Sequence, residues 1–139
     1  DGPMPLKRGL AKSKNMISIR ILEAIGPPFA QQWVSRFGFE ADKHPAFLTM
    51  ALGAGSVTPL QMASGYGVFA NGGYLVAPRL IERITDYRGR VLQDSPTHKP
   101  DESMRVIDAR NAYVMTDLLQ EVTRSGTAAK AVSCAAGSG

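Results

Sequence analysis

The stretch from Gly9 to Gly26, GLAKSKNMISIRILEAIG, constrains the fold of this chain more than any other. Isoleucine recurs at every fourth position from Ile17 to Ile25, which predicts one apolar face of a helix. The sequence Gly26-Pro27-Pro28 then ends this helix and begins another, because proline suits a first helical turn but not a helix interior. The entry of the helix carries a small polar group, Ser13-Lys14-Asn15.

Three further helices are expected downstream. The first places Phe29, Trp33 and Phe37 on one stripe, a spacing typical of core residues, and ends at Gly38. The next begins at Thr58, where Gln61 completes a capping box, and runs to Ala70. Its inward face is predicted to hold Met62, Tyr66, Phe69 and Ala70. The last helix is capped by Asp108 and closes at Ser125-Gly126.

One β-hairpin is expected, with strands at 80–86 and 90–93 and a turn at 87–89. Residues 1–8 contain two prolines and are expected to be extended. Helices outnumber strands, there are no repeats, and no boundary divides the chain. The sequence therefore predicts an α+β fold in which residues 1–139 form part of one domain.

Composition narrows the possible functions. The net charge of +4 is scattered and has no interleaved aromatic residues, so it does not favour nucleic-acid binding. No apolar run approaches the roughly 20 residues of a membrane span, and the start lacks the apolar region of a signal peptide. Because the chain starts at Asp1 without an initiator methionine, we expect it to begin within a longer protein.

Most reactive residue types lack a pattern that indicates a site. His44 and His98 each lie near a proline in a predicted loop, without a partner at metal-ligand spacing, so both are expected on the surface. The single cysteine, Cys134, excludes an internal disulfide and is expected to be inert. The remaining candidate, Ser13-Lys14-Asn15, is by itself better explained as a helix cap than as a catalytic group.

Three ordered blocks change the interpretation of that triplet. Ser13-Lys14-Asn15 is followed by MISIRILEAIG, then by LTMALGAGSVTPLQMASGYGVFANGGYLVAPRLIERITDYRGRVL, and then by IDARNAYVMTDLLQEVTRSGTAAKA. Together they resemble the transpeptidase domain of the class A, bifunctional penicillin-binding proteins. The resemblance covers residues 6 to about 131, and the blocks have the family's order and spacing.

The resemblance implies the helix-rich part of the fold shared by penicillin-binding proteins and serine β-lactamases, with the central antiparallel sheet largely outside this chain. The family places three motifs around one pocket: S-x-x-K, S-x-N and K-T-G. Here no serine is followed by lysine three residues on, and no lysine begins K-T-G. We therefore expect the central portion of the domain, between those two motifs. The tail from Ser133 to Gly139 departs from the family's usual approach to the K-T-G strand.

The resemblance implies a peptidoglycan D,D-transpeptidase. The serine of S-x-x-K would attack the D-Ala-D-Ala carbonyl of a stem peptide, and an amine of a neighbouring stem would then take the acyl group. Ser13 would relay a proton between the S-x-x-K lysine and the departing amine, because a hydroxyl both donates and accepts. Asn15 would hydrogen-bond that lysine or the substrate amide. Lys14 would point away or only add positive potential, which would suit the substrate carboxylate. No metal or organic cofactor is implied.

The implied partners are stem peptides ending in D-Ala-D-Ala, β-lactam antibiotics and the remaining segments of the same domain, with no nucleic acid. The parent would be anchored by an N-terminal span and would act on the periplasmic, outer face of the bacterial inner membrane. This chain alone would be inactive. Two alternatives stay open: a D,D-carboxypeptidase or serine β-lactamase of the same fold, and a non-catalytic scaffold in which Ser13 and Asn15 are only caps.

Overall fold

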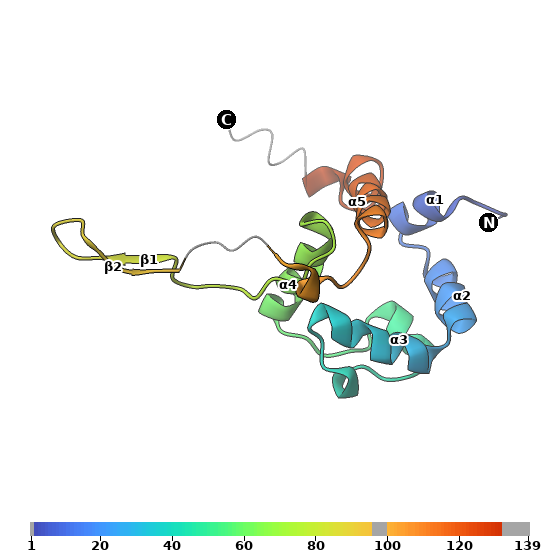
Figure 1. Cartoon of the computed structure of the whole chain (residues 1–139). Coiled ribbons are helices and arrows are strands. Elements are labelled where there is room, and N and C mark those ends of the chain that lie inside the picture. Colours follow the sequence, from blue (N-terminus) through green and yellow to red (C-terminus); the bar gives the residue numbers. More distant parts are fainter. Residues whose placement is uncertain (1, 96–99, 132–139) are drawn as a thin grey trace.

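The computed structural model describes residues 2–95 and 100–131 (Figure 1). Within these residues the chain is α+β, with a set of helices and one antiparallel hairpin, as predicted. None of the described helices is long and apolar enough to cross a membrane. In chain order the helices and strands are α1 Leu6–Ala11, α2 Asn15–Ile25, α3 Pro27–Val34, α4 Pro59–Ala70, β1 Arg83–Thr85, β2 Val91–Asp94 and α5 Ala109–Arg124. Short 3₁₀ helices add η1 Ser35–Phe37, η2 Ala41–Lys43, η3 Leu48–Leu52 and η4 Glu102–Met104.

The helices pack around α5 and α2. Helix α5 contacts α1 and α4, while α2 contacts α1, α3 and η3 (Figure 1). The break between α2 and α3 is the one predicted, since Gly26 has a φ of 88° and Pro27 opens the next helix. The apolar side chains buried between the described elements are few and mostly small: Ala11, Leu22, Ala30, Val68, Val106 and Ala112.

The prediction that residues 1–8 are extended is wrong from Leu6 onward, where α1 begins. Pro5 takes the N-cap position with an extended ψ of 143°. Proline is compatible with a helix start because the first N–H groups of a helix need no intrahelical partner. The two prolines therefore mark the segment before a helix, and α1 is then held by its contact with α5.

The aromatic stripe is exposed at its first two residues, so the prediction that it is core is wrong for Phe29 and Trp33. Phe29 is 55% exposed and Trp33 is 39% exposed. Their rings stack on each other with centroids 5.7 Å apart, and the Arg36 guanidinium lies 4.3 Å from the Trp33 ring centre. Phe37, the last residue of the stripe, is half-buried, and its ring centre lies 5.5 Å from that of Phe69 on α4. Helical spacing identified the stripe, but it did not show how much of it neighbouring elements cover.

The start of α4 is as predicted, whereas its buried face is not. Thr58 and Gln61 form both hydrogen bonds of the capping box, at 2.9 and 3.1 Å. The buried residues of the helix are Gly65 and Val68, while the predicted inward residues Met62, Tyr66 and Ala70 are exposed and Phe69 is half-buried. A Cβ atom at Gly65 would lie 2.7 Å from the Phe39 ring, so this glycine allows a close approach between α4 and the segment after η1.

The β1–β2 hairpin projects away from the helices (Figure 1). The first strand is shorter than predicted, the second has the predicted length and begins one residue later, and the two pair antiparallel with an irregularity after Ile84. Ion pairs at 3.1 Å between Arg83 and Asp94 and at 3.2 Å between Arg90 and Asp86 hold it together. All its strand residues are exposed, since no other described strand extends the pair.

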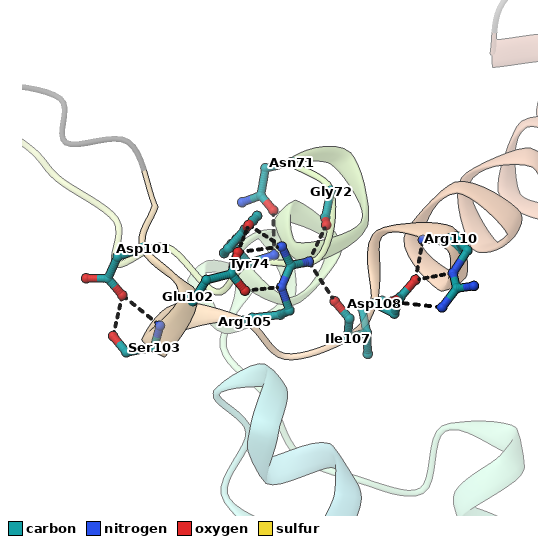
Figure 2. Close-up of polar contacts among 10 residues, drawn as sticks. All are labelled: Asn71, Gly72, Tyr74, Asp101, Glu102, Ser103, Arg105, Ile107, Asp108 and Arg110. Carbon is teal, nitrogen blue, oxygen red and sulfur yellow. Dashed lines mark hydrogen bonds and ion pairs between the residues drawn. The ribbon is translucent and has the colours of Figure 1, made fainter.

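Arg105 is the centre of a polar cluster that ties the segment after α4 to the segment before α5 (Figure 2). Its guanidinium donates to the Glu102 carboxylate at 2.6 Å and lies 4.3 Å from the centre of the Tyr74 ring. The Tyr74 hydroxyl donates to the same carboxylate at 2.8 Å. Arg105 also donates to the carbonyl oxygens of Gly72 and Ile107. The cluster thereby sets where α5 begins relative to α4.

Acidification is expected to weaken this cluster. Hydrogen bonds from Arg105, and next from Tyr74, lower the pKa of Glu102 from 4.5 to about 2. Because the folded pKa is the lower one, the carboxylate stabilises the fold above the unfolded pKa, and this contribution is lost as the pH falls toward about 2. Thermal unfolding of the chain between about pH 6 and about pH 2 should show the loss, and Glu102→Gln should flatten the curve in that window.

The matched control is Glu23→Gln on α2. Within the described residues the Glu23 carboxylate makes no hydrogen bond or ion pair. This variant should keep the slope of the parent chain. An unchanged slope in Glu102→Gln would mean that the cluster does not contribute to acid stability.

Candidate functional site

The candidate site lies at the turn between α1 and α2, and an ion-pair clamp holds α1 in place. Lys7 donates to both carboxylate oxygens of Asp117 on α5, at 3.1 and 2.9 Å, and lies 3.6 Å from Glu121. The hydrogen bond to Asp117 raises the pKa of Lys7. Since Lys7 lies on the first turn of α1, the clamp fixes the helix that leads into the turn.

The end of α5 touches the end of α1 through backbone atoms. The N–H of Thr127 donates to the carbonyl oxygen of Ala11 at 3.1 Å. A Cβ atom at Gly126 would lie 2.3 Å from that carbonyl oxygen and 2.7 Å from the carbonyl oxygen of Val122. Only glycine allows the two segments to approach this closely, so residues far apart in the sequence meet here.

Ser13 lies in the turn that follows α1. Its N–H donates to the carbonyl oxygen of Leu10 at 2.9 Å, and its φ of 50° is the one positive value among the described non-glycine residues. Such a left-handed conformation is uncommon for serine and requires the surrounding contacts to maintain it. The side chain is exposed, and its Oγ lies 3.4 Å from Oγ1 of Thr127. The turn therefore presents the hydroxyl outward, next to a second hydroxyl.

Asn15 is the first residue of α2, and Lys14 occupies the N-cap position. No side chain caps this helix. Consequently the interpretation of Ser13 and Asn15 as ordinary helix caps does not hold in the structure, and the Asn15 side chain is exposed at the helix entry. Their catalytic roles stay a prediction.

Lys14 lines a hollow beside the helix entry. The hollow has a volume of about 760 Å³ and is also lined by Met16, Ile17, Arg20 and residues 2–4. Lys14 and Arg20 are the two cationic side chains among its lining residues. The expected preference of Lys14 for a carboxylate is compatible with this position and stays a prediction.

His44 is buried, which corrects the expectation that it lies on the surface. It is 9% exposed, and its Nε2 atom has no hydrogen-bond partner among the described residues. Its ring packs edge-on against Phe39 and beside Gly55, whereas its carbonyl oxygen accepts a hydrogen bond from Gln31. An X-Pro loop predicts irregular backbone but not exposure, since glycine and aromatic neighbours can enclose the ring.

His44 also lines an apolar cavity of about 370 Å³ formed by η1, η3 and α4. In the described part of the chain no three histidine, cysteine or carboxylate side chains lie together as metal ligands would. His98, Cys134 and the Ser133–Gly139 tail lie outside the described residues.

Thr127 is the residue of this site that the sequence analysis did not identify. Its only signal was the sequence Gly126-Thr127-Ala128 after the last helix, within the third block. Its partner Ser13 is 114 positions away. Spacing along the chain gives no hint of this contact, because it depends on how α1 packs on α5.

Comparisons with known proteins agree on one family. The sequence profile described as "Penicillin binding protein transpeptidase domain" matches residues 1–139. The chain is 50% identical over 128 residues to penicillin-binding protein 1A of Neisseria flavescens, covering 91% of this chain and 16% of that protein. It is 35% identical over 178 residues to penicillin-binding protein 1A of Pseudomonas aeruginosa, covering 95% of this chain and 22% of that protein.

The fold is also similar to a solved structure. The crystal structure of penicillin-binding protein 1A from Haemophilus influenzae superposes with a TM-score of 0.83 at 33% identity. The match covers 94% of this chain and 24% of that one. The chain thus spans less than a quarter of the length of each of these relatives.

Proposed function

The chain belongs to the transpeptidase domain family of the penicillin-binding proteins, and from this premise we propose that it is the central portion of a peptidoglycan D,D-transpeptidase domain. The complete domain would crosslink stem peptides ending in D-Ala-D-Ala through a serine acyl-enzyme, and β-lactams would acylate the same serine. The observation that carries the proposal is the family match over the whole chain, with the S-x-N motif at the entry of α2.

We assign the chemistry of this segment to Ser13 and Asn15. Both side chains are exposed, and neither is used to cap α2, so their polar atoms can face a reacting group. Ser13 would pass a proton between the lysine of S-x-x-K and the leaving amine, and Asn15 would orient that lysine or the substrate amide. Lys14, on the wall of the hollow, would at most add positive potential, which would suit the substrate carboxylate.

The other partners of the chain would be the remaining segments of the same domain. Large apolar side chains such as Phe29, Phe47 and Leu60 are more than half exposed. Burying such side chains is worth roughly 1.5–3 kcal/mol each, so a covering segment would gain stability from them. The parent would be anchored in the inner membrane of a bacterium and would act on its periplasmic side.

Labelling with a fluorescent penicillin tests the proposal. A protein that carries these residues together with its S-x-x-K and K-T-G segments should form a covalent adduct that survives denaturation. The 139-residue chain alone should form none, because no S-x-x-K serine is present in it. Mass spectrometry of the adduct identifies the acylated residue.

Two outcomes would contradict this assignment. A covalent adduct on the isolated chain would show that the nucleophile lies within these residues. No labelling of the longer protein would contradict the transpeptidase function itself. Supplying an amine acceptor with a stem-peptide substrate then separates a transpeptidase, which transfers the acyl group to the amine, from a carboxypeptidase, which transfers it to water.

A further inference from the structure

We propose that Thr127 is a positioning residue for Ser13, holding the Ser13 hydroxyl in the orientation that proton transfer needs. This inference rests on the proposed function. Its starting observation is the approach of the two hydroxyl oxygens to 3.4 Å across a separation of 114 residues. Thr127 itself would not touch the substrate; it would act through Ser13.

The position of the Thr127 hydroxyl is well determined by the backbone around it. The N–H of Thr127 donates to Ala11 at 3.1 Å, and the N–H of Ala128 donates to Val122 at 3.2 Å. The close approach at Gly126 leaves no room for the segment to shift toward α1. Threonine is also stiff at χ1, because two heavy atoms on its Cβ restrict the rotamers. The Thr127 hydroxyl is therefore held in one position, from which it can orient a side chain that has more rotational freedom.

Ser13 is such a group. Its backbone is held in the left-handed conformation by the turn, but an exposed serine side chain can occupy three staggered rotamers. In the described structure Thr127 is the side chain that contacts the Ser13 hydroxyl. A polar partner on one side favours the rotamer that points toward it and so reduces the entropy lost when the reacting groups align.

The length of the contact suits this role. A separation of 3.4 Å is long for a hydroxyl–hydroxyl bond, for which about 2.7–2.8 Å is usual. A strong bond would compete with the lysine and the amine between which Ser13 would pass a proton. A weak partner orients the hydroxyl and can exchange its hydrogen bond during the reaction, since either oxygen can be the donor.

The test compares Thr127→Val and Thr127→Ser in the longer protein that carries the S-x-x-K and K-T-G segments. Valine keeps the branched shape and removes the hydroxyl, whereas serine keeps the hydroxyl. We expect Thr127→Val to lower the first-order constant for acylation by a fluorescent penicillin about tenfold, the scale of a modest misalignment. The drug concentration for half-saturation should change less than about twofold, and Thr127→Ser should recover most of the rate.

The matched control is Thr123→Val on α5. The Thr123 hydroxyl is also exposed and donates to the Gln120 carbonyl at 2.8 Å, but it does not contact Ser13. The Thr123→Val protein should be acylated by the penicillin at the parent rate. Equal rates for Thr127→Val and the parent would overturn the positioning role, as would a failure of Thr127→Ser to recover the rate. An unlabelled parent protein would instead contradict the proposed function, so the two failures are distinct.

Discussion

Ser13→Ala, in the protein that carries all three motifs, is expected to slow acylation by a fluorescent penicillin about 10²- to 10⁴-fold, the usual contribution of a positioned proton-transfer group. The melting temperature should hardly change. Ser13 is exposed and caps no helix, and surface substitutions of this kind usually stay within about 0.5 kcal/mol. The measurement is the labelling rate under single-turnover conditions, with thermal unfolding of the same samples.

Two further variants separate chemistry from stability. Ser13→Gly also removes the hydroxyl, but it relieves the φ of 50°, a conformation that costs a non-glycine residue about 1–2 kcal/mol. It should lose as much rate as Ser13→Ala without losing stability. Ser35→Ala removes an exposed hydroxyl that donates to the Gln32 carbonyl on α3, and it should leave the rate unchanged. If Ser13→Ala lowered stability by about 1 kcal/mol and left the rate intact, the Ser13 hydroxyl would have a structural role and no part in proton transfer.

Local signals in the sequence predicted the ends of elements well. Gly26-Pro27-Pro28 separates α2 from α3, the Thr58–Gln61 box opens α4, and the Asp108 side chain accepts the hydrogen bond from the N–H of Arg110 that caps α5. In each case the deciding interaction lies within a few residues. Capping and proline effects depend on backbone geometry alone, so a single sequence contains the necessary information.

Burial was predicted less well, because it depends on contacts between distant segments. Tyr66 was expected inside and is 53% exposed, whereas His44 was expected outside and is 9% exposed. In α4 the close packing is made at Gly65 against the Phe39 ring, so the buried face follows the glycine rather than the largest side chains. Helical periodicity identifies a face, but it does not say which neighbour covers that face.

The candidate site was predicted in part for the same reason. The triplet Ser13-Lys14-Asn15 became a candidate through the family's ordered blocks, and the structure places it at the entry of α2. The left-handed turn at Ser13 and its contact with Thr127 were not foreseen. Both lie where α1 meets α5, and that packing joins opposite ends of the chain through the Lys7–Asp117 ion pair and the close approach at Gly126.

Gly126→Ala is expected to have the largest effect on stability among these variants. The added methyl group would lie 2.3 Å from the carbonyl oxygen of Ala11 and 2.7 Å from that of Val122, and neither backbone atom can rotate away as a side chain could. Overpacking of this kind costs about 1–3 kcal/mol, and losing the Thr127–Ala11 hydrogen bond would add about 0.5–1.5 kcal/mol. Thermal or urea unfolding of the chain measures the loss.

Gly67→Ala is the control, and its expected change in the free energy of unfolding has the opposite sign. Gly67 lies in the interior of α4 with nothing near its Cβ position, so Gly67→Ala should stabilise the chain by about 0.5–1 kcal/mol. A Gly126→Ala chain that unfolded no earlier than the parent would show that the segment after α5 can move without cost. The positioning role of Thr127 would then lose its structural basis.

A double-mutant cycle in the longer protein connects this approach to the chemistry. If Gly126→Ala moves Thr127 away from Ser13, it should slow acylation about as much as Thr127→Val does, because both remove the same hydroxyl contact. Adding Thr127→Val to Gly126→Ala should then cost almost nothing more, and the coupling between the two changes should nearly equal the effect of either alone. If the two losses in acylation rate were additive, Gly126 and Thr127 would influence the reaction independently. The contact between the Thr127 and Ser13 hydroxyls would then not be what connects the end of α5 to the S-x-N motif.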